Sequence, residues 1–282
     1  MKTNSALNWG MRTLAVVVAF ASASVFAADS STSTATAANV APKLSDKMSV
    51  KYLGILVGPS VRGISEGAID QQSDGSKVFL FNRMALSTNL TKEINAGLTT
   101  EFDLTADPKA RARDLYLRAG HSKWLTAGNL KVSGDFFRAY LPTSIKAHNT
   151  HRVVGLRFYP TVEYQIGSSR WSLTSYQYVQ KNIHTEAAGG DQMFAEWVPV
   201  VNYQLNPKVS FYGNFDGVLK NKQGASLTNW SDSGENEWDI GASYDVTPKF
   251  NVSPYLAFPA NMEAKRNLGT LSINVLVSAK LL

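Results

Sequence analysis

The sequence holds four histidines, the side chains best suited to acid–base or metal chemistry near neutral pH: His121, His148, His151 and His184. A lipid hydrolase would need a serine nucleophile supported by one of them, and no motif around them supplies it. The pair in "HNTH" is an incomplete ligand set for zinc. No glycine-rich nucleotide-binding pattern is present. We therefore expect no catalytic residue, no metal site and no cofactor.

Charged residues offer a different chemistry, the steering of ions and polar solutes. A basic group comes from the first half of the chain and an acidic group from the second: Lys51, Arg83, Arg118, Lys131 and Arg157, then Glu196, Asp216, Glu237, Asp239 and Asp245. Two such groups facing each other across water would create a transverse field. The alternative is that neighbouring pairs, such as Glu101 with Arg118, cancel each other and only brace a wall.

The elements that must position these charges show a regular alternation of apolar and polar residues. In 151–166, Val154, Leu156 and Phe158 share one face, while Arg157 and Tyr159 share the other, as in a β-strand. We count about twelve such segments, at 48–58, 77–88, 93–104, 112–121, 124–138, 151–166, 171–181, 192–205, 208–219, 236–246, 249–258 and 268–281.

Connections between these segments alternate between short and long, as in a membrane barrel with periplasmic turns and extracellular loops. The short ones are "STNLTK", "HSK", "GSSR", "NPK" and "TPK". The last two follow Tyr203 and Tyr244, whose rings suit a lipid interface. Their lysines, Lys208 and Lys249, are expected to face the inner-leaflet headgroups.

A soluble sandwich or lipocalin-like barrel would place its apolar face inside instead. The polar faces here are rich in Tyr, Asn, Ser and Gly with scattered charges, unlike a solvated surface. Aromatic residues also gather near both ends of the segments, as at two lipid interfaces. A charge at the bilayer midplane costs about 2–4 kcal/mol, so we expect the two charged groups to line the lumen. Tyrosines on the same faces either form a path for solutes or fill the barrel: Tyr116, Tyr159, Tyr176, Tyr178, Tyr212 and Tyr255.

The head of the chain predicts export. Residues 1–27 have the polar start, apolar run and small-residue end of a signal peptide. Residues 28–47 are rich in Ser, Thr and Ala and predict a flexible segment, so residues 48–282 would form the barrel. The chain has no cysteine and a formal net charge of +6, without a basic run or motif typical of nucleic-acid binding.

The pattern over 48–282 resembles Gram-negative outer-membrane β-barrel proteins, especially twelve-stranded porin-like channels. The resemblance implies an all-β, transmembrane, antiparallel up-and-down barrel in the cell outer membrane, without enzyme activity. It also implies contact with outer-membrane lipids and lipopolysaccharide, and assembly by periplasmic chaperones and the barrel-assembly machinery. One departure is the end at Leu281 and Leu282, where such proteins commonly carry an aromatic residue.

The function that follows is passive diffusion of small hydrophilic or charged solutes through a porin-like channel. The alternatives are a non-conducting barrel that works through its surface loops and, less favoured, a lipid-acting barrel enzyme. The sequence leaves the solute and the oligomeric state open. Pro160, Pro199 and Pro254 fall within predicted strands, where we expect bulges or kinks.

Overall fold

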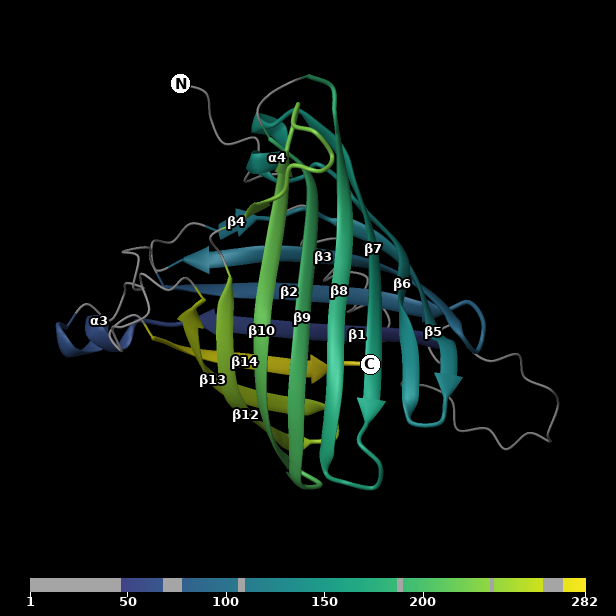
Figure 1. The fold of residues 1–282 in the computed structure, drawn as a ribbon, viewed down its shortest axis with the longest axis vertical. Coiled ribbons are helices and arrows are strands. Elements are labelled where there is room, and N and C mark those ends of the chain that lie inside the picture. The colour runs from purple at the N-terminus through teal and green to yellow at the C-terminus, as the bar shows by residue number, and fades with distance from the viewer. Residues whose placement is uncertain (1–46, 68–77, 106–109, 187–189, 234–235, 261–270) are drawn as a thin grey trace, which may run out of the picture.

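The computed structural model describes residues 47–67, 78–105, 110–186, 190–233, 236–260 and 271–282, which form a closed β-barrel (Figure 1). The predicted signal peptide and the predicted flexible segment lie outside the described residues, apart from Lys47.

Twelve antiparallel strands form the wall. They are β1 (Met48–Val57), β2 (Phe79–Asn89), β3 (Ile94–Thr105), β5 (Tyr116–Ala127), β6 (Leu130–Tyr140), β7 (Arg152–Gln165), β8 (Trp171–His184), β9 (Asp191–Asn206), β10 (Val209–Lys222), β12 (Glu237–Thr247), β13 (Phe250–Pro259) and β14 (Ser272–Lys280). Two short strands, β4 (Ala110–Ala112) and β11 (Ser231–Asp232), pair antiparallel with β3 and β10. The helices are α3 (Val61–Ser65) and α4 (Ile145–Asn149). Within the described ranges, neither is a candidate to cross a membrane.

Each wall strand pairs with the next along the chain, and β14 pairs with β1 to close the ring. Closure satisfies the backbone groups that an open edge would leave unpaired in lipid. The short turns lie at one end of the barrel, and helices α3 and α4 lie at the other (Figure 1). The predicted up-and-down barrel is therefore confirmed.

One predicted turn is wrong. We expected "HSK" to separate two strands, but β5 continues through it to Ala127, and the chain turns at Gly128 and Asn129. Gly128 has a φ of 56°, which a glycine adopts without strain. His121, expected at a turn, therefore lies in β5 opposite Ile94, with Nε2 3.3 Å from Oε2 of Glu93.

The expected bulges at the prolines are only partly correct. Pro199 keeps its register partner Ser175 on β8, and Pro254 keeps Val275 on β14. Neither proline shifts the register. Each falls in a gap in the pairing with its other neighbouring strand, because a proline has no backbone N–H to donate to the ladder. Pro160 faces Gly134 on β6, where the ladder does shift, between Asp135 and Arg138.

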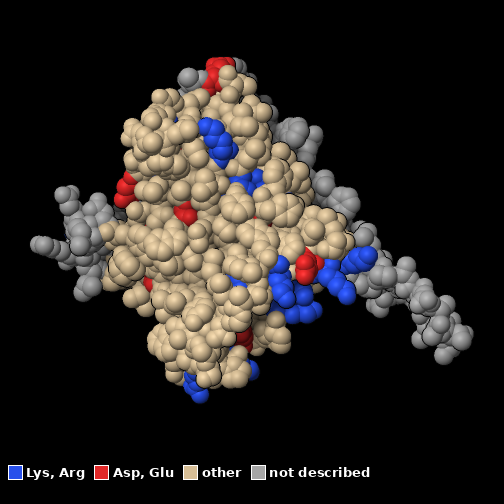
Figure 2. All heavy atoms as spheres, turned by 45° about the vertical axis from the view of Figure 1, so that its right-hand side comes forward, with Lys and Arg blue, Asp and Glu red and all other residues tan. Residues whose placement is uncertain are grey.

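The outward face of the wall is apolar. Phe158, Val201 and Ile240 are 48%, 44% and 60% exposed, values that suit contact with lipid and not a soluble core. Figure 2 shows one side of the molecule, dominated by uncharged residues, with Lys, Arg, Asp and Glu sparse among them. An outward asparagine, Asn82, is only 3% exposed, because the hydroxyl of Tyr52 donates to its Oδ1 over 2.8 Å.

Candidate functional site

The inward face carries the charged residues singled out in the sequence. On each strand they occupy the phase opposite to the exposed apolar side chains: Lys51, Arg83, Arg118, Lys131, Arg157, Glu196, Asp216, Glu237, Asp239 and Asp245. In the ring of strands, β2, β3 and β5 lie opposite β9, β10 and β12. The interior therefore has a basic wall and an acidic wall.

The basic wall contains a stack of arginine and tyrosine side chains from four adjacent strands. We call it the arginine–tyrosine stack: Arg138 and Arg157 with Tyr116, Tyr140, Tyr159 and Tyr178. The Cζ of Arg138 lies 3.9 Å from the ring centroid of Tyr159, and that of Arg157 lies 3.6 Å from the centroid of Tyr178. Both distances are within the range of a cation–π interaction, so the stack holds the guanidinium groups against the wall.

Carboxylates neutralise several of the basic residues. Glu101 binds Arg83, with Nε and Oε1 2.7 Å apart, and not Arg118 as the sequence suggested. Arg118 instead binds Asp135, whose Oδ1 lies 2.8 Å from its Nη2. The partner changes because Gly120 faces Asp135 in the register and leaves room for its carboxylate, which a side chain at 120 would overlap.

Arg138 points inward, although strict alternation along β6 would point it outward. Counted from Asp135, the next inward positions would be 137 and 139, but the register shift between Asp135 and Arg138 turns Arg138 inward. Phe136 and Phe137 are both exposed, at 47% and 43%, as expected for a β-bulge. Arg138 Nε then lies 2.5 Å from Oδ2 of Asp135. The adjacent pair of large apolar residues is the signal that would have revealed this bulge.

The acidic wall is built from β9, β10 and β12. Asp216 lies opposite Glu237 in the register, and Asn214 Nδ2 donates to Oδ2 of Asp239 over 3.0 Å. The other oxygen of Asp239 is buried without a hydrogen-bond partner among the described residues. The ion pairs described above thus concentrate on the basic wall.

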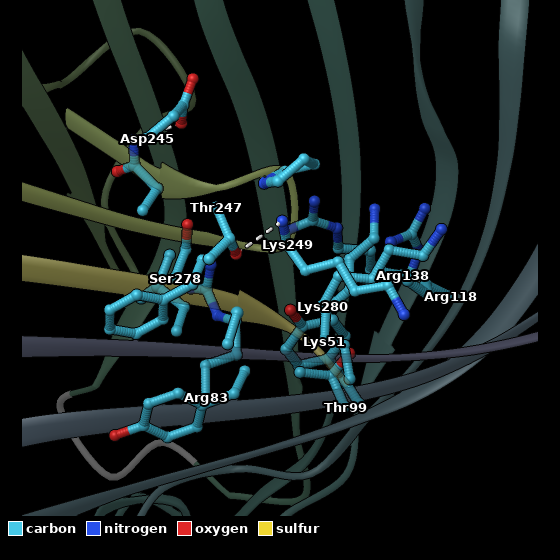
Figure 3. Close-up of a pocket in the computed structure, with 18 residues that line it drawn as sticks. Lys51, Arg83, Thr99, Arg118, Arg138, Asp245, Thr247, Lys249, Ser278 and Lys280 are labelled. Carbon is cyan, nitrogen blue, oxygen red and sulfur yellow. Dashed lines mark hydrogen bonds between the residues drawn. The ribbon is translucent and has the colours of Figure 1, made fainter. Parts of the chain in front are cut away.

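Solvent reaches parts of this interior. The side chains of Lys131 and Glu163, whose Nζ and Oε2 are 3.3 Å apart, are each 45% exposed although both point inward. The side chain of Arg83 is 39% exposed. A recess of about 430 Å³ lies between the basic wall and β12–β14, near the end with the short turns (Figure 3). The barrel is therefore only partly filled by its own side chains.

Lys249 lies among the residues that line this recess, next to the turn between β12 and β13. We expected it to face the lipid headgroups together with Lys208, which occupies the same place in the sister turn. The two turns lie beside different strands, β12 for Lys208 and β14 for Lys249. The carbonyl of Lys208 accepts from the amide of Asp245, whereas that of Lys249 accepts from the amide of Lys280. For Lys249 the expectation is wrong.

The histidines of the loop end contact backbone carbonyls. His148 Nδ1 lies 3.0 Å from the carbonyl oxygen of Ser144, and His184 Nδ1 lies 2.7 Å from that of Thr150. His151 is near the exposed Glu186, at 3.8 Å. The described part of the chain contains no group of three or more His, Cys, Asp and Glu side chains arranged to hold a metal ion. These contacts fix the described loops around α4.

Comparisons with solved structures support the fold. An outer-membrane channel from Pseudomonas putida F1 matches with a TM-score of 0.52 and 13% identity, over 83% of this chain and 95% of that one. The NanC porin gives 0.49 and 11%, over 82% and 100%, and an outer-membrane phospholipase of Salmonella typhi gives 0.40 and 12%, over 83% and 90%. The last two scores are too low to support an argument. No family model and no curated protein matches the sequence. The chain therefore shares the closed β-barrel fold of that channel, as predicted.

Proposed function

We propose that the protein is a porin-like channel through which small hydrophilic or charged solutes diffuse passively. The observation that carries the proposal is the division of the wall into an apolar outer face and an inner face of charged and polar residues that solvent partly reaches. A barrel with a purely structural role would gain more from a filled apolar or fully paired interior.

Selectivity in this proposal comes from the two charged walls. A polar solute passing between Arg118 on β5 and Glu237 on the opposite strand β12 would orient in the field between them. The arginine–tyrosine stack holds Arg138 and Arg157 in place, so the positive side of the field is preorganised. No chemical step and no conformational cycle is required.

Planar-bilayer recording tests the proposal. The purified full-length protein is expected to give discrete conductance steps in potassium chloride, well above those of the detergent alone. Steps absent over many insertions, from protein shown to be folded, would instead identify a closed barrel that works through its loops. A phospholipase assay on the same sample covers the lipid-acting alternative, which requires hydrolysis that a His148→Ala or His184→Ala variant loses.

A further inference from the structure

The recess near the short-turn end is strongly cationic. Six basic side chains line it: Lys51, Arg83, Arg118, Arg138, Lys249 and Lys280. Asp245 is the single carboxylate among the described lining residues, and its Oδ1 accepts from Asn251 Nδ2 over 2.8 Å. Figure 3 shows the labelled ends of Lys249, Lys280, Arg118 and Arg138 gathered on one side of this space. The recess is thus a small volume with an excess of positive charge.

Three lysines account for most of that excess. The arginines have carboxylate partners within the barrel, Glu101 for Arg83 and Asp135 for Arg118 and Arg138. Within the described residues, Lys51, Lys249 and Lys280 have no ion pair. We call these residues the lysine triad; all three are exposed, and all three line the recess. Like charges directly opposite each other on neighbouring strands are destabilising, and Lys51 and Lys280 are such a pair.

From this geometry we infer that the recess is a binding subsite for small solutes with two or more negative charges, carried as carboxylates or phosphate groups. An ammonium group offers three donors and no acceptor, so three lysines around one space can bond several anionic oxygens at once. The volume of about 430 Å³ is within the usual range for small-molecule pockets. Because the recess lies inside the ring of strands, the ligand is a dissolved solute and not a membrane lipid.

The inference rests on the proposed function only in that a subsite here would lie on the solute's path. Binding itself is measured without a membrane, so the two can fail separately. Detergent-solubilised full-length protein is titrated with citrate and with inorganic phosphate by isothermal titration calorimetry at low salt, with glucose as the neutral control. We expect saturable binding of citrate, and weaker binding of phosphate, that declines as salt screens the lysines.

Variants locate the subsite. Lys249→Gln is expected to weaken citrate binding about tenfold, because it removes one charge-assisted hydrogen bond to the anion. Adding Lys51→Gln and Lys280→Gln should abolish measurable binding. Lys208→Gln is the matched control, because Lys208 follows a proline in the sister turn but does not line the recess. Circular dichroism verifies that each variant is folded. If the triple variant does not fold, the citrate affinity of the single Lys249→Gln variant tests the inference.

Three outcomes would overturn the inference: no saturable binding of either anion, unchanged affinity in the folded variants, or an equal loss in Lys208→Gln. Any of these leaves the conductance result untouched. In the converse outcome, the protein gives no conductance but binds citrate saturably, with binding lost when the lysine triad is replaced. That result would support an anion-binding recess in a closed barrel.

Discussion

Lys51 of β1 lies directly opposite Lys280 of β14, in the strand pair that closes the barrel. The two positions are at opposite ends of the described chain, and only ring closure brings them together. Two like charges in this strand pair weaken the pairing that completes the wall. The lysines that make the recess cationic therefore also reduce the stability of the barrel.

Replacing one of these lysines by an acid is therefore expected to stabilise the protein. Lys280→Glu converts a repulsive pair into an attractive one and should raise the free energy of unfolding by about 0.2–1 kcal/mol. Denaturant unfolding in detergent micelles measures the change, with Lys280→Gln expected in between. A Lys280→Glu variant less stable than the parent would show that the seam is not under electrostatic strain.

Asp135 is expected to be the carboxylate most important for stability. It is 2% exposed and binds both Arg118 and Arg138. Asp135→Asn keeps the shape but leaves two inward arginines without their anion, which should cost about 3–5 kcal/mol of unfolding free energy. The matched control is Asp103→Asn, whose partner Arg113 has a side chain 45% exposed, and a loss of about 1 kcal/mol or less is expected there. Equal losses in both variants would contradict this ranking.

The arginine–tyrosine stack should restrict the channel. Tyr178→Ala removes a ring from the inner face and is expected to raise the single-channel conductance. It should also remove a cation–π contribution of about 0.5–2 kcal/mol to stability. Tyr164→Ala, on the outward face at 44% exposed, should leave the conductance unchanged. Conductance insensitive to Tyr178→Ala would place the narrowest point elsewhere.

Ion selectivity should follow the two walls. Replacing Arg83, Arg118 and Arg157 by Gln is expected to shift the reversal potential toward cations, because three inward positive charges are lost and Glu101 is left without its partner. Asp135 keeps Arg138 as a partner. Glu237→Gln should shift the reversal potential the opposite way. The reversal potential of each variant under a salt gradient gives the direction of its shift. Shifts of the two variants in the same direction would refute the two-walled interior.

The bulge on β6 should depend on Gly134. Its φ is 133°, and an added Cβ would overlap the carbonyl oxygen of Tyr159 on β7. Gly134→Ala is expected to destabilise the barrel by about 1–3 kcal/mol or more, through backbone strain and displacement of β7. Gly213→Ala provides the control, since its added Cβ would meet nothing closer than 3.8 Å. Refolding yield and unfolding free energy in detergent compare the two, and a tolerated Gly134→Ala would mean that the bulge can form without this conformation.

The sequence alone determined the class of fold and the sidedness of the wall. Alternation along single strands is a local property, so Val154, Leu156 and Phe158 could be assigned to lipid, and Arg157 to the interior, without knowing any partner strand. The two charged groups followed from the same local rule, because a charge facing lipid is costly.

Only the tertiary structure decided which charges meet. Arg118 binds Asp135 and not Glu101 because the register of β5 against β6 sets Gly120 opposite the carboxylate. Arg138 turns inward because a bulge breaks the period of two. Lys249 joins Lys51 and Lys280 because the ring closes beside its turn. These relationships depend on hydrogen-bond register between strands distant in the chain, and no residue pattern within one strand encodes it.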